Sequence, residues 1–222
     1  MLDARIRKLT PNEEVDYLFM KYALQDYARP RAKITALLKS KELIRVKKGL
    51  YVLDGKNPRN PFVKETLANL IYGPSYISLE YALAFYRFIP ERVEMVTSVS
   101  SRKDKLFKTP LGLFSYRYLN PAKYCIGVTQ VMYDATHPIL IATPEKALAD
   151  QILLGIPNLH FDDINDVENF LFEDLRIPYE KIAQLNRKLF SKIAALVGNK
   201  NINFLNQFLK KLRKKKCMKS SQ

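Results

Sequence analysis

Basic side chains recur between residues 29 and 51 at spacings that fit a short helix followed by a tight hairpin. Guanidinium and ammonium groups neutralise phosphates, and such groups make most of the backbone contacts that position a protein on DNA. The chemistry expected of this segment is therefore binding to a polyanion rather than a reaction. The expected DNA-binding residues of the helix and hairpin are Arg29, Arg31, Lys33, Thr35, Ala36, Lys39, Arg45, Lys47 and Lys48.

The helix that would present these residues begins at Pro30, because proline is tolerated at the first helical position. At about a hundred degrees per residue, Ile34, Leu37 and Leu38 share one stripe and should face a core. The opposite face carries Ala32, Thr35, Ala36 and Lys39, whose small members would let the backbone approach base edges. Arg31 and Lys33 flank this face, where they could hold phosphates.

A hairpin should follow this helix directly. Ile44 and Val46 alternate with basic residues, and a second apolar run, Leu50 to Leu53, follows Lys48-Gly49. Gly49 can supply the positive φ of a tight turn, which places Lys47 and Lys48 at the tip. Helix and hairpin together predict a winged helix-turn-helix that binds double-stranded DNA; the alternative is a merely solvated basic surface.

The rest of the chain divides into further regions by pattern. A helix capped by Thr10 or Asn12, with Val15, Leu18, Phe19 and Tyr22 at helical spacing, should precede the basic helix, and a turn-rich linker covers residues 54–61. We therefore expect an α+β fold with a winged helix-turn-helix domain at 1–56, a mixed α/β domain at 57–157 and a helical region with a basic tail at 158–222.

The middle and C-terminal regions differ in their predicted elements. The middle region should contain helices at 62–71, after Ser78 and after Thr143, with strands at 93–99, 113–118, 126–132 and 139–142. Beyond residue 160 only helical patterns occur, including one long helix through Ile182, Leu185, Leu189, Ile193 and Val197.

Composition limits the partners that are expected. The 222 residues are 47% apolar and carry a formal net charge of +15, which favours a folded protein with a polyanionic partner. An anionic membrane is the weaker choice, because no window approaches twenty uninterrupted apolar residues and the first residues have no secretory apolar region. We expect a cytoplasmic protein without a membrane partner.

Residues that could support catalysis do not form a pattern. Glycine-rich phosphate loops are absent, and His137 and His160 have no nucleophile that the sequence pairs with them. Glu145 and Asp150 lie half a turn apart on one helix and should not converge. Cys125 and Cys217 have no metal-ligand spacing. We expect no enzyme activity, no cofactor and no metal.

Two alternatives remain open at this point. One is a nucleic-acid-processing enzyme with its site in the middle region; the other is an RNA-binding protein that uses exposed aromatic residues on a sheet, for which Tyr116 and Tyr118 alternate suitably. The segment from Ser98 to Lys105 could bind phosphate or could be a flexible charged loop.

Three motifs in order, LIRVKKGLYVL, SYISLEYALAFY and IATPEKALAD, resemble the AbiEi family of antitoxins and transcriptional regulators of bacterial type IV toxin–antitoxin systems. The resemblance implies a winged domain that represses its own operon by binding operator DNA, and a C-terminal region that neutralises a nucleotidyltransferase-like toxin. It adds Tyr51 to the expected wing residues and leaves open whether the chain forms a homodimer. The family's strand-to-helix signature matches Thr143, Pro144, Glu145, Ala147, Leu148 and Asp150.

Overall fold

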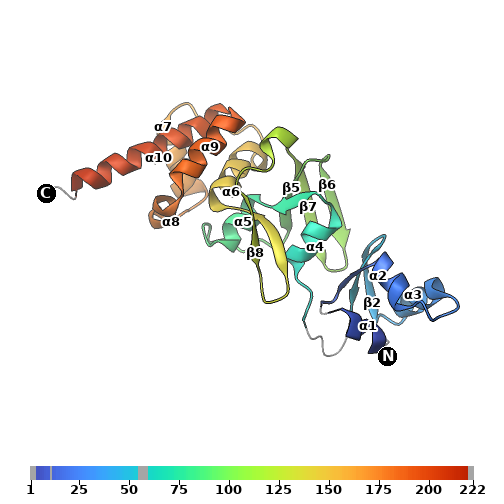
Figure 1. Ribbon diagram of the computed structural model, residues 1–222. Coiled ribbons are helices and arrows are strands. Elements are labelled where there is room, and N and C mark those ends of the chain that lie inside the picture. The colour runs from blue at the N-terminus through green and yellow to red at the C-terminus, as the bar shows by residue number, and fades with distance from the viewer. Residues whose placement is uncertain (1–3, 11, 55–59, 220–222) are drawn as a thin grey trace.

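The computed structural model describes residues 4–10, 12–54 and 60–219, with side chains from Ile6 to Leu212. Its fold is α+β, as expected from the sequence. Figure 1 shows a small N-terminal part, a central six-stranded sheet and a group of C-terminal helices, with the two chain ends at opposite ends of the molecule. Most of the predicted linker at 54–61 lies outside the described residues.

The N-terminal part combines helices with a three-stranded antiparallel sheet in the order β1-β3-β2. Its elements are α1 (Ala4–Leu9), β1 (Glu14–Asp16), α2 (Tyr17–Ala23), α3 (Pro30–Lys39), β2 (Leu43–Lys47) and β3 (Leu50–Leu53). The helix and hairpin at 30–53 were predicted from the sequence and are confirmed as elements. The helix expected to begin near Thr10 or Asn12 was wrong in its start, because residues 14–16 pair with β3 and the Asp16 carboxylate caps α2 by accepting from the Phe19 N–H at 2.7 Å.

Strand β3 is buried on both faces, which joins the N-terminal part to the rest of the chain. Tyr51 and Leu53 belong to a small core with α1, α2 and α3, whereas Leu50 and Val52 belong to the larger core of the middle region. Alternate residues of a strand point to opposite faces, so the small sheet lies between its own helices and the body of the protein. The apolar run from Leu50 to Leu53 is thereby explained.

The central sheet has the strand order β6-β7-β5-β4-β9-β8. Pairs β5–β7 and β4–β9 are parallel, and the remaining neighbours are antiparallel. The strands are β4 (Ser75–Ile77), β5 (Val96–Ser100), β6 (Lys105–Thr109), β7 (Gly112–Tyr118), β8 (Val128–Met132) and β9 (Pro138–Ala142). The sequence did not predict β6, whose polar residues form a strand because they pair along β7.

Helices pack on this sheet and on one another. Helices α4 (Lys64–Ile71), α5 (Leu79–Phe85) and α6 (Pro144–Asp150) contact the sheet, and α9 (Arg187–Val197) contacts α6. Thr143 caps α6 as expected: its hydroxyl oxygen accepts from the Lys146 N–H. The C-terminal helices are α7 (Ile164–Asn169), α8 (Tyr179–Gln184), α9 (Arg187–Val197) and α10 (Lys200–Lys219).

The single long helix expected from Ile182 to Val197 is wrong, because the chain breaks between α8 and α9. At the break the Glu145 carboxylate accepts from the Asn186 N–H at 2.6 Å, and the Asn186 side chain caps α9 by accepting from the Leu189 N–H at 3.1 Å. A cap and a buried carboxylate satisfy the backbone groups that a continuous helix would have paired.

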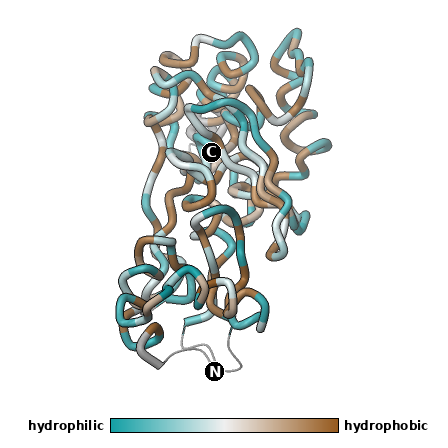
Figure 2. Tube along the Cα trace, turned by 90° about the vertical axis from the view of Figure 1, so that its right-hand side faces the viewer, coloured by the Kyte–Doolittle hydropathy of each residue, from teal (hydrophilic) through white to brown (hydrophobic). Residues whose placement is uncertain are grey.

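The C-terminal helices share the large core with the sheet, through residues such as Phe170, Ile182 and Leu205. Figure 2 shows apolar stretches alternating with polar ones in both the smaller and the larger part. Across the described ranges, none of the helices combines the length and the apolar character needed to cross a membrane.

Candidate nucleic-acid interface

Helix α3 divides into a buried and an exposed face in the way its sequence predicted. Ile34 and Leu37 are 4% and 2% exposed, and they pack against Met20 and Ala23 of α2. The residues of the opposite face, Ala32, Thr35, Ala36 and Lys39, are all exposed. The Thr35 hydroxyl donates to the carbonyl of Arg31, so its methyl group and the two alanines form a smooth surface along the helix.

The cations beside this face are held by aromatic side chains. The Arg31 Nε–H donates to the Tyr17 hydroxyl at 3.0 Å, and this hydrogen bond raises the pKa of the Arg31 guanidinium. The Lys33 ammonium lies 5.2 Å from the centre of the Tyr27 ring. Arg29 is exposed at the start of α3. The sequence reasoning did not identify Tyr17, since its contact with Arg31 depends on how α2 crosses α3.

The hairpin β2–β3 turns at Lys48-Gly49, where Gly49 has a φ of +86° and open space around its Cα. Lys48 is exposed at the tip. Arg45 is also exposed and pairs across the strands with Tyr51, which faces the same core as α3. Arg45 and α3 therefore lie on the same side of the small sheet.

Lys47 does not lie free at the tip, which corrects the expectation from the sequence. The register of β2 is irregular between Arg45 and Lys47, and the Lys47 ammonium donates to the carbonyl of Ile71, the last residue of α4. A cation at a helix C-terminus complements the unpaired carbonyl groups there. Burial, together with repulsion from Arg102 and Lys105, lowers the pKa of Lys47.

Tyr51 is a second correction among the expected DNA contacts. Its side chain is only 7% exposed and lies in the small core. It supports the hairpin from behind but has almost no surface to offer to a ligand.

A second group of cations lies close to Lys47, in the loop between β5 and β6 and at the start of β6. Arg102, Lys103 and Lys105 are all exposed. The Arg102 guanidinium lies 5.8 Å and the Lys105 ammonium 5.7 Å from the centre of the Tyr72 ring. The Asp104 carboxylate in the same loop is directed to β7, where it accepts from the Tyr118 N–H at 2.7 Å and pairs with Arg117. The loop thus extends the basic surface from the hairpin onto the central sheet.

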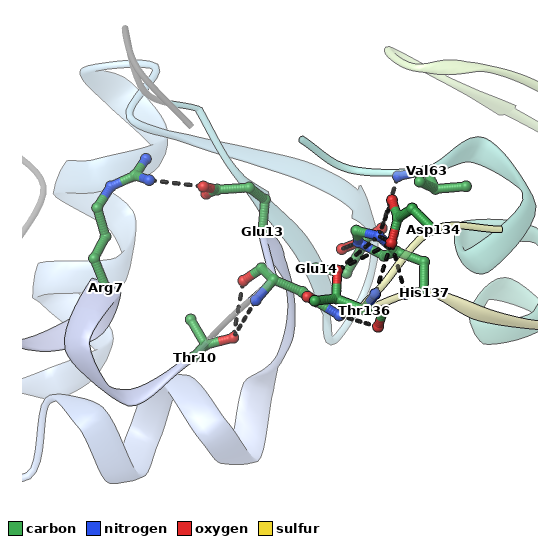
Figure 3. Close-up of polar contacts among 9 residues, drawn as sticks. Arg7, Thr10, Glu13, Glu14, Val63, Asp134, Thr136 and His137 are labelled. Carbon is green, nitrogen blue, oxygen red and sulfur yellow. Dashed lines mark hydrogen bonds and ion pairs between the residues drawn. The ribbon is translucent and has the colours of Figure 1, made fainter. Parts of the chain in front are cut away.

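Two carboxylates and a histidine fix the N-terminal part against the body (Figure 3). His137 is fully buried; its Nδ1 lies 2.8 Å from Asp134 Oδ2, and its Nε2 lies 3.3 Å from Glu14 Oε2 on β1. The other oxygen of Glu14 accepts from the Val63 N–H at 2.9 Å. His137 thus joins β1 to the β8–β9 turn.

The family-like signature at the start of α6 forms a buried polar cluster. Lys146 Nζ lies 2.8 Å from Asp150 Oδ1, while the hydroxyls of Ser78 and Tyr76 donate to Asp150 Oδ2 at 2.7 and 2.9 Å. Burial raises the pKa of Asp150, and the charge of Lys146 opposes that shift. Because every member is nearly or fully buried, the cluster ties α6 to β4 rather than facing a substrate.

The other residues considered for catalysis or RNA binding do not form a common site. Glu145 bonds to Asn186, so it does not converge with Asp150, and the exposed His160 contacts Asp162 at 3.0 Å. Tyr116 is 1% exposed and donates to the Ala68 carbonyl, so it cannot stack on a base as the RNA-binding alternative requires.

Cys125 is an exposed free thiol. The side chain of Cys217 and those of the basic tail are not among the side chains that the structure describes. In the part of the chain that the structure describes, no group of three or more His, Cys, Asp or Glu side chains could hold a metal ion. No protein-family model matches this chain, and no curated protein matches it.

Proposed function

We propose that this protein is a DNA-binding transcriptional repressor whose N-terminal part acts as a winged helix-turn-helix. The order α1-β1-α2-α3-β2-β3 with its three-stranded antiparallel sheet supports this proposal. Helix α3 is the recognition helix, the β2–β3 hairpin is the wing, and the partner is an operator in double-stranded DNA.

One observation carries the proposal. The exposed face of α3 is small and uncharged at Ala32, Thr35 and Ala36, while exposed cations border it on α3 and on the wing. Small side chains let a helix approach base edges in the major groove, and thymine methyl groups can contact alanine or the threonine methyl. Arg29, Arg31, Lys33, Lys39, Arg45 and Lys48 are the proposed phosphate contacts.

The β5–β6 loop is assigned to the same interface. The exposed cations Arg102, in this loop, and Lys105, at the start of β6, lie close enough to Lys47 to contribute to its lowered pKa. Cations that lie close together repel one another, and a bound polyanion relieves this repulsion. We therefore expect these cations to bind phosphates that flank the wing.

The proposal extends to a second role as an antitoxin, on the resemblance to the AbiEi family. The body beyond the wing has a large core of its own that includes the sheet and the C-terminal helices, which exceeds what a DNA reader requires. The partner in this role is a nucleotidyltransferase-like toxin. Enzyme activity is not proposed: the buried polar cluster around Asp150 has no exposed member that could meet a substrate.

Selection of bound duplexes from a random library by the full-length protein tests the DNA-binding role. We expect recovery of a defined sequence, followed by loss of preference for it in Ala36→Leu, whose larger side chain would keep α3 from the bases. Lys48→Ala should weaken binding to all duplexes alike. Lys188→Ala, an exposed lysine of α9 at the far end of the molecule, is the matched control. Recovery of random sequences only, or no DNA binding, would contradict the proposal.

A further inference from the structure

A cavity of about 730 Å³ lies between the starts of α4 and β5 and the β8–β9 turn. Residues 61–65, just before and within the first turn of α4, form part of its lining. The basic surface lies at the opposite end of α4, at Tyr72. Tyr81 and Phe85 of α5 form one wall and Tyr133 another, with the rings of Phe85 and Tyr133 6.5 Å apart. The volume is in the range of pockets for small organic ligands.

The buried wall of this cavity carries a carboxylate that has no basic partner among the described residues. Glu65 is 7% exposed, and its Oε1 accepts from the Tyr81 hydroxyl at 2.7 Å. The other carboxylates of the lining each have a basic partner: Glu91 pairs with Arg176, Glu94 with Arg92, and Asp134 with His137. Within the described residues Glu65 forms no ion pair, although buried charges in proteins are usually paired.

Glu65 affects the pKa values of two tyrosines that line the cavity. Burial raises the pKa of Tyr81 far above its usual range, with the hydrogen bond to Glu65 adding to the effect. The charge of Glu65 is also the largest cause of the raised pKa of Tyr133 on the other wall. Both phenols therefore stay protonated, and the Tyr81 hydroxyl remains a hydrogen-bond donor to Glu65.

We propose that this cavity binds an organic cation, a guanidinium or alkylammonium group. The positive charge lies against Glu65, and the cation packs on the rings of Tyr81, Phe85 and Tyr133. Aromatic rings attract cations through their negative faces, and the attraction is strongest where water is excluded. Four carboxylates and two basic side chains line the cavity, so its local charge is negative on a protein whose net charge is +15.

Isothermal titration calorimetry of the full-length protein tests this site with three probes. Spermidine represents a free polyamine, the blocked peptide Ala-Arg-Ala represents an arginine side chain of a partner protein, and the peptide with citrulline in place of arginine is the uncharged isostere. We expect at least one cationic probe to bind with a dissociation constant of about 1 mM or tighter, and the citrulline peptide to bind at least tenfold more weakly. The tighter of the two cationic probes identifies the source of the ligand.

The variants decide whether the site is the one proposed. Glu65→Gln should weaken binding of the cationic probe at least tenfold, whereas Glu168→Gln, at an exposed carboxylate of α7 outside the lining, should change it less than threefold. Tyr133→Leu removes a half-exposed ring and should weaken binding several-fold, which keeps the test valid if Glu65→Gln does not fold. Absence of binding by both cations, or equal binding by wild type, Glu65→Gln and Tyr133→Leu, would overturn the inference without affecting the DNA-binding proposal.

Discussion

At the scale of single residues, the contact between Tyr17 and Arg31 orients a charged side chain of α3, the proposed recognition helix. The Tyr17 hydroxyl accepts from Nε of Arg31, which leaves the terminal guanidinium nitrogens free to meet a phosphate. Arg31 was expected as a DNA contact from its position on the helix, but the residue that orients it comes from another helix.

Removing this hydroxyl should weaken DNA binding by a modest and specific amount. Tyr17→Phe keeps the ring and loses one hydrogen bond of about 0.5–1.5 kcal/mol, which corresponds to roughly two- to tenfold in affinity. Fluorescence anisotropy with a labelled duplex measures it. Tyr22→Phe, another exposed tyrosine of α2, serves as the control, and an Arg31→Ala background should abolish the effect of Tyr17→Phe. Equal losses in both backgrounds would rule out the orienting role.

The two neighbouring lysines of the wing should behave differently when each is replaced by alanine. Lys48 is exposed at the tip, so Lys48→Ala should weaken DNA binding while stability stays within about 0.5 kcal/mol. Lys47 bonds to the end of α4, so Lys47→Ala should lower the free energy of unfolding by about 1 kcal/mol, because the carbonyl of Ile71 loses its donor.

Urea denaturation of the two lysine variants, alongside their DNA titrations, separates these roles. The distinction fails if Lys48→Ala is the less stable protein or if Lys47→Ala leaves the denaturation midpoint unchanged.

At the scale of elements, the small sheet is held to the body by polar contacts of β1 and by apolar residues of β3. Glu14 on β1 accepts from Val63 and contacts His137, and β3 contributes Leu50 and Val52 to the large core. The N-terminal part is thus packed on the body and not merely tethered to it.

Glu14→Ala should therefore loosen this attachment. Two buried polar contacts are lost and His137 keeps only its contacts within its own turn, so we expect a loss of about 1–3 kcal/mol in stability. In hydrogen-exchange measurements, Glu14→Ala should accelerate exchange of the β1 and β3 amides more than exchange of the β5 and β7 amides. Glu168→Ala on the exposed side of α7 is the control, and uniform acceleration in all strands would contradict a local role for Glu14.

The elements that the sequence predicted are those whose signals are local. Pro30 begins α3, Gly49 forms the turn of the hairpin and Thr143 caps α6, each through its own backbone or side chain. Strand β1 and the break at Asn186 were missed because they depend on partners far along the chain, β3 and Glu145.

The same distinction holds for the candidate site. The exposed face of α3 follows from helical spacing alone, so it could be predicted. The inward turn of Lys47 could not, because it depends on an irregular register and on where α4 ends. Tyr51 could not be recognised as buried, because both faces of its strand are covered by different parts of the chain.

At the scale of the whole molecule, the two proposed roles should be separable without truncating the chain. Deleting residues 1–56 would remove Val46, Leu50 and Val52 from the large core, so loss of toxin neutralisation in such a fragment would be ambiguous. Surface substitutions avoid this difficulty, since Arg31 and Lys48 are exposed.

We expect full-length protein carrying Arg31→Ala and Lys48→Ala to lose repression of its promoter while it still rescues growth of cells that express the cognate toxin. A promoter–reporter assay and a growth assay in the same strain measure the two effects. If this variant loses rescue together with repression, neutralisation cannot be assigned to the body; if the wild type does not rescue either, the protein is a regulator alone.

The salt dependence of DNA binding by the full-length protein tests the central claim most directly. The proposed phosphate contacts come from exposed arginines and lysines of α3 and the wing, and neutralising roughly five phosphates gives a slope of about −4 to −5 in a plot of log affinity against log salt concentration. Anisotropy titrations between about 50 and 200 mM salt should show this slope. Arg31→Ala should reduce its magnitude by about one, and Lys188→Ala should leave it unchanged. A flat salt response, or a slope that Arg31→Ala does not alter, would contradict the account.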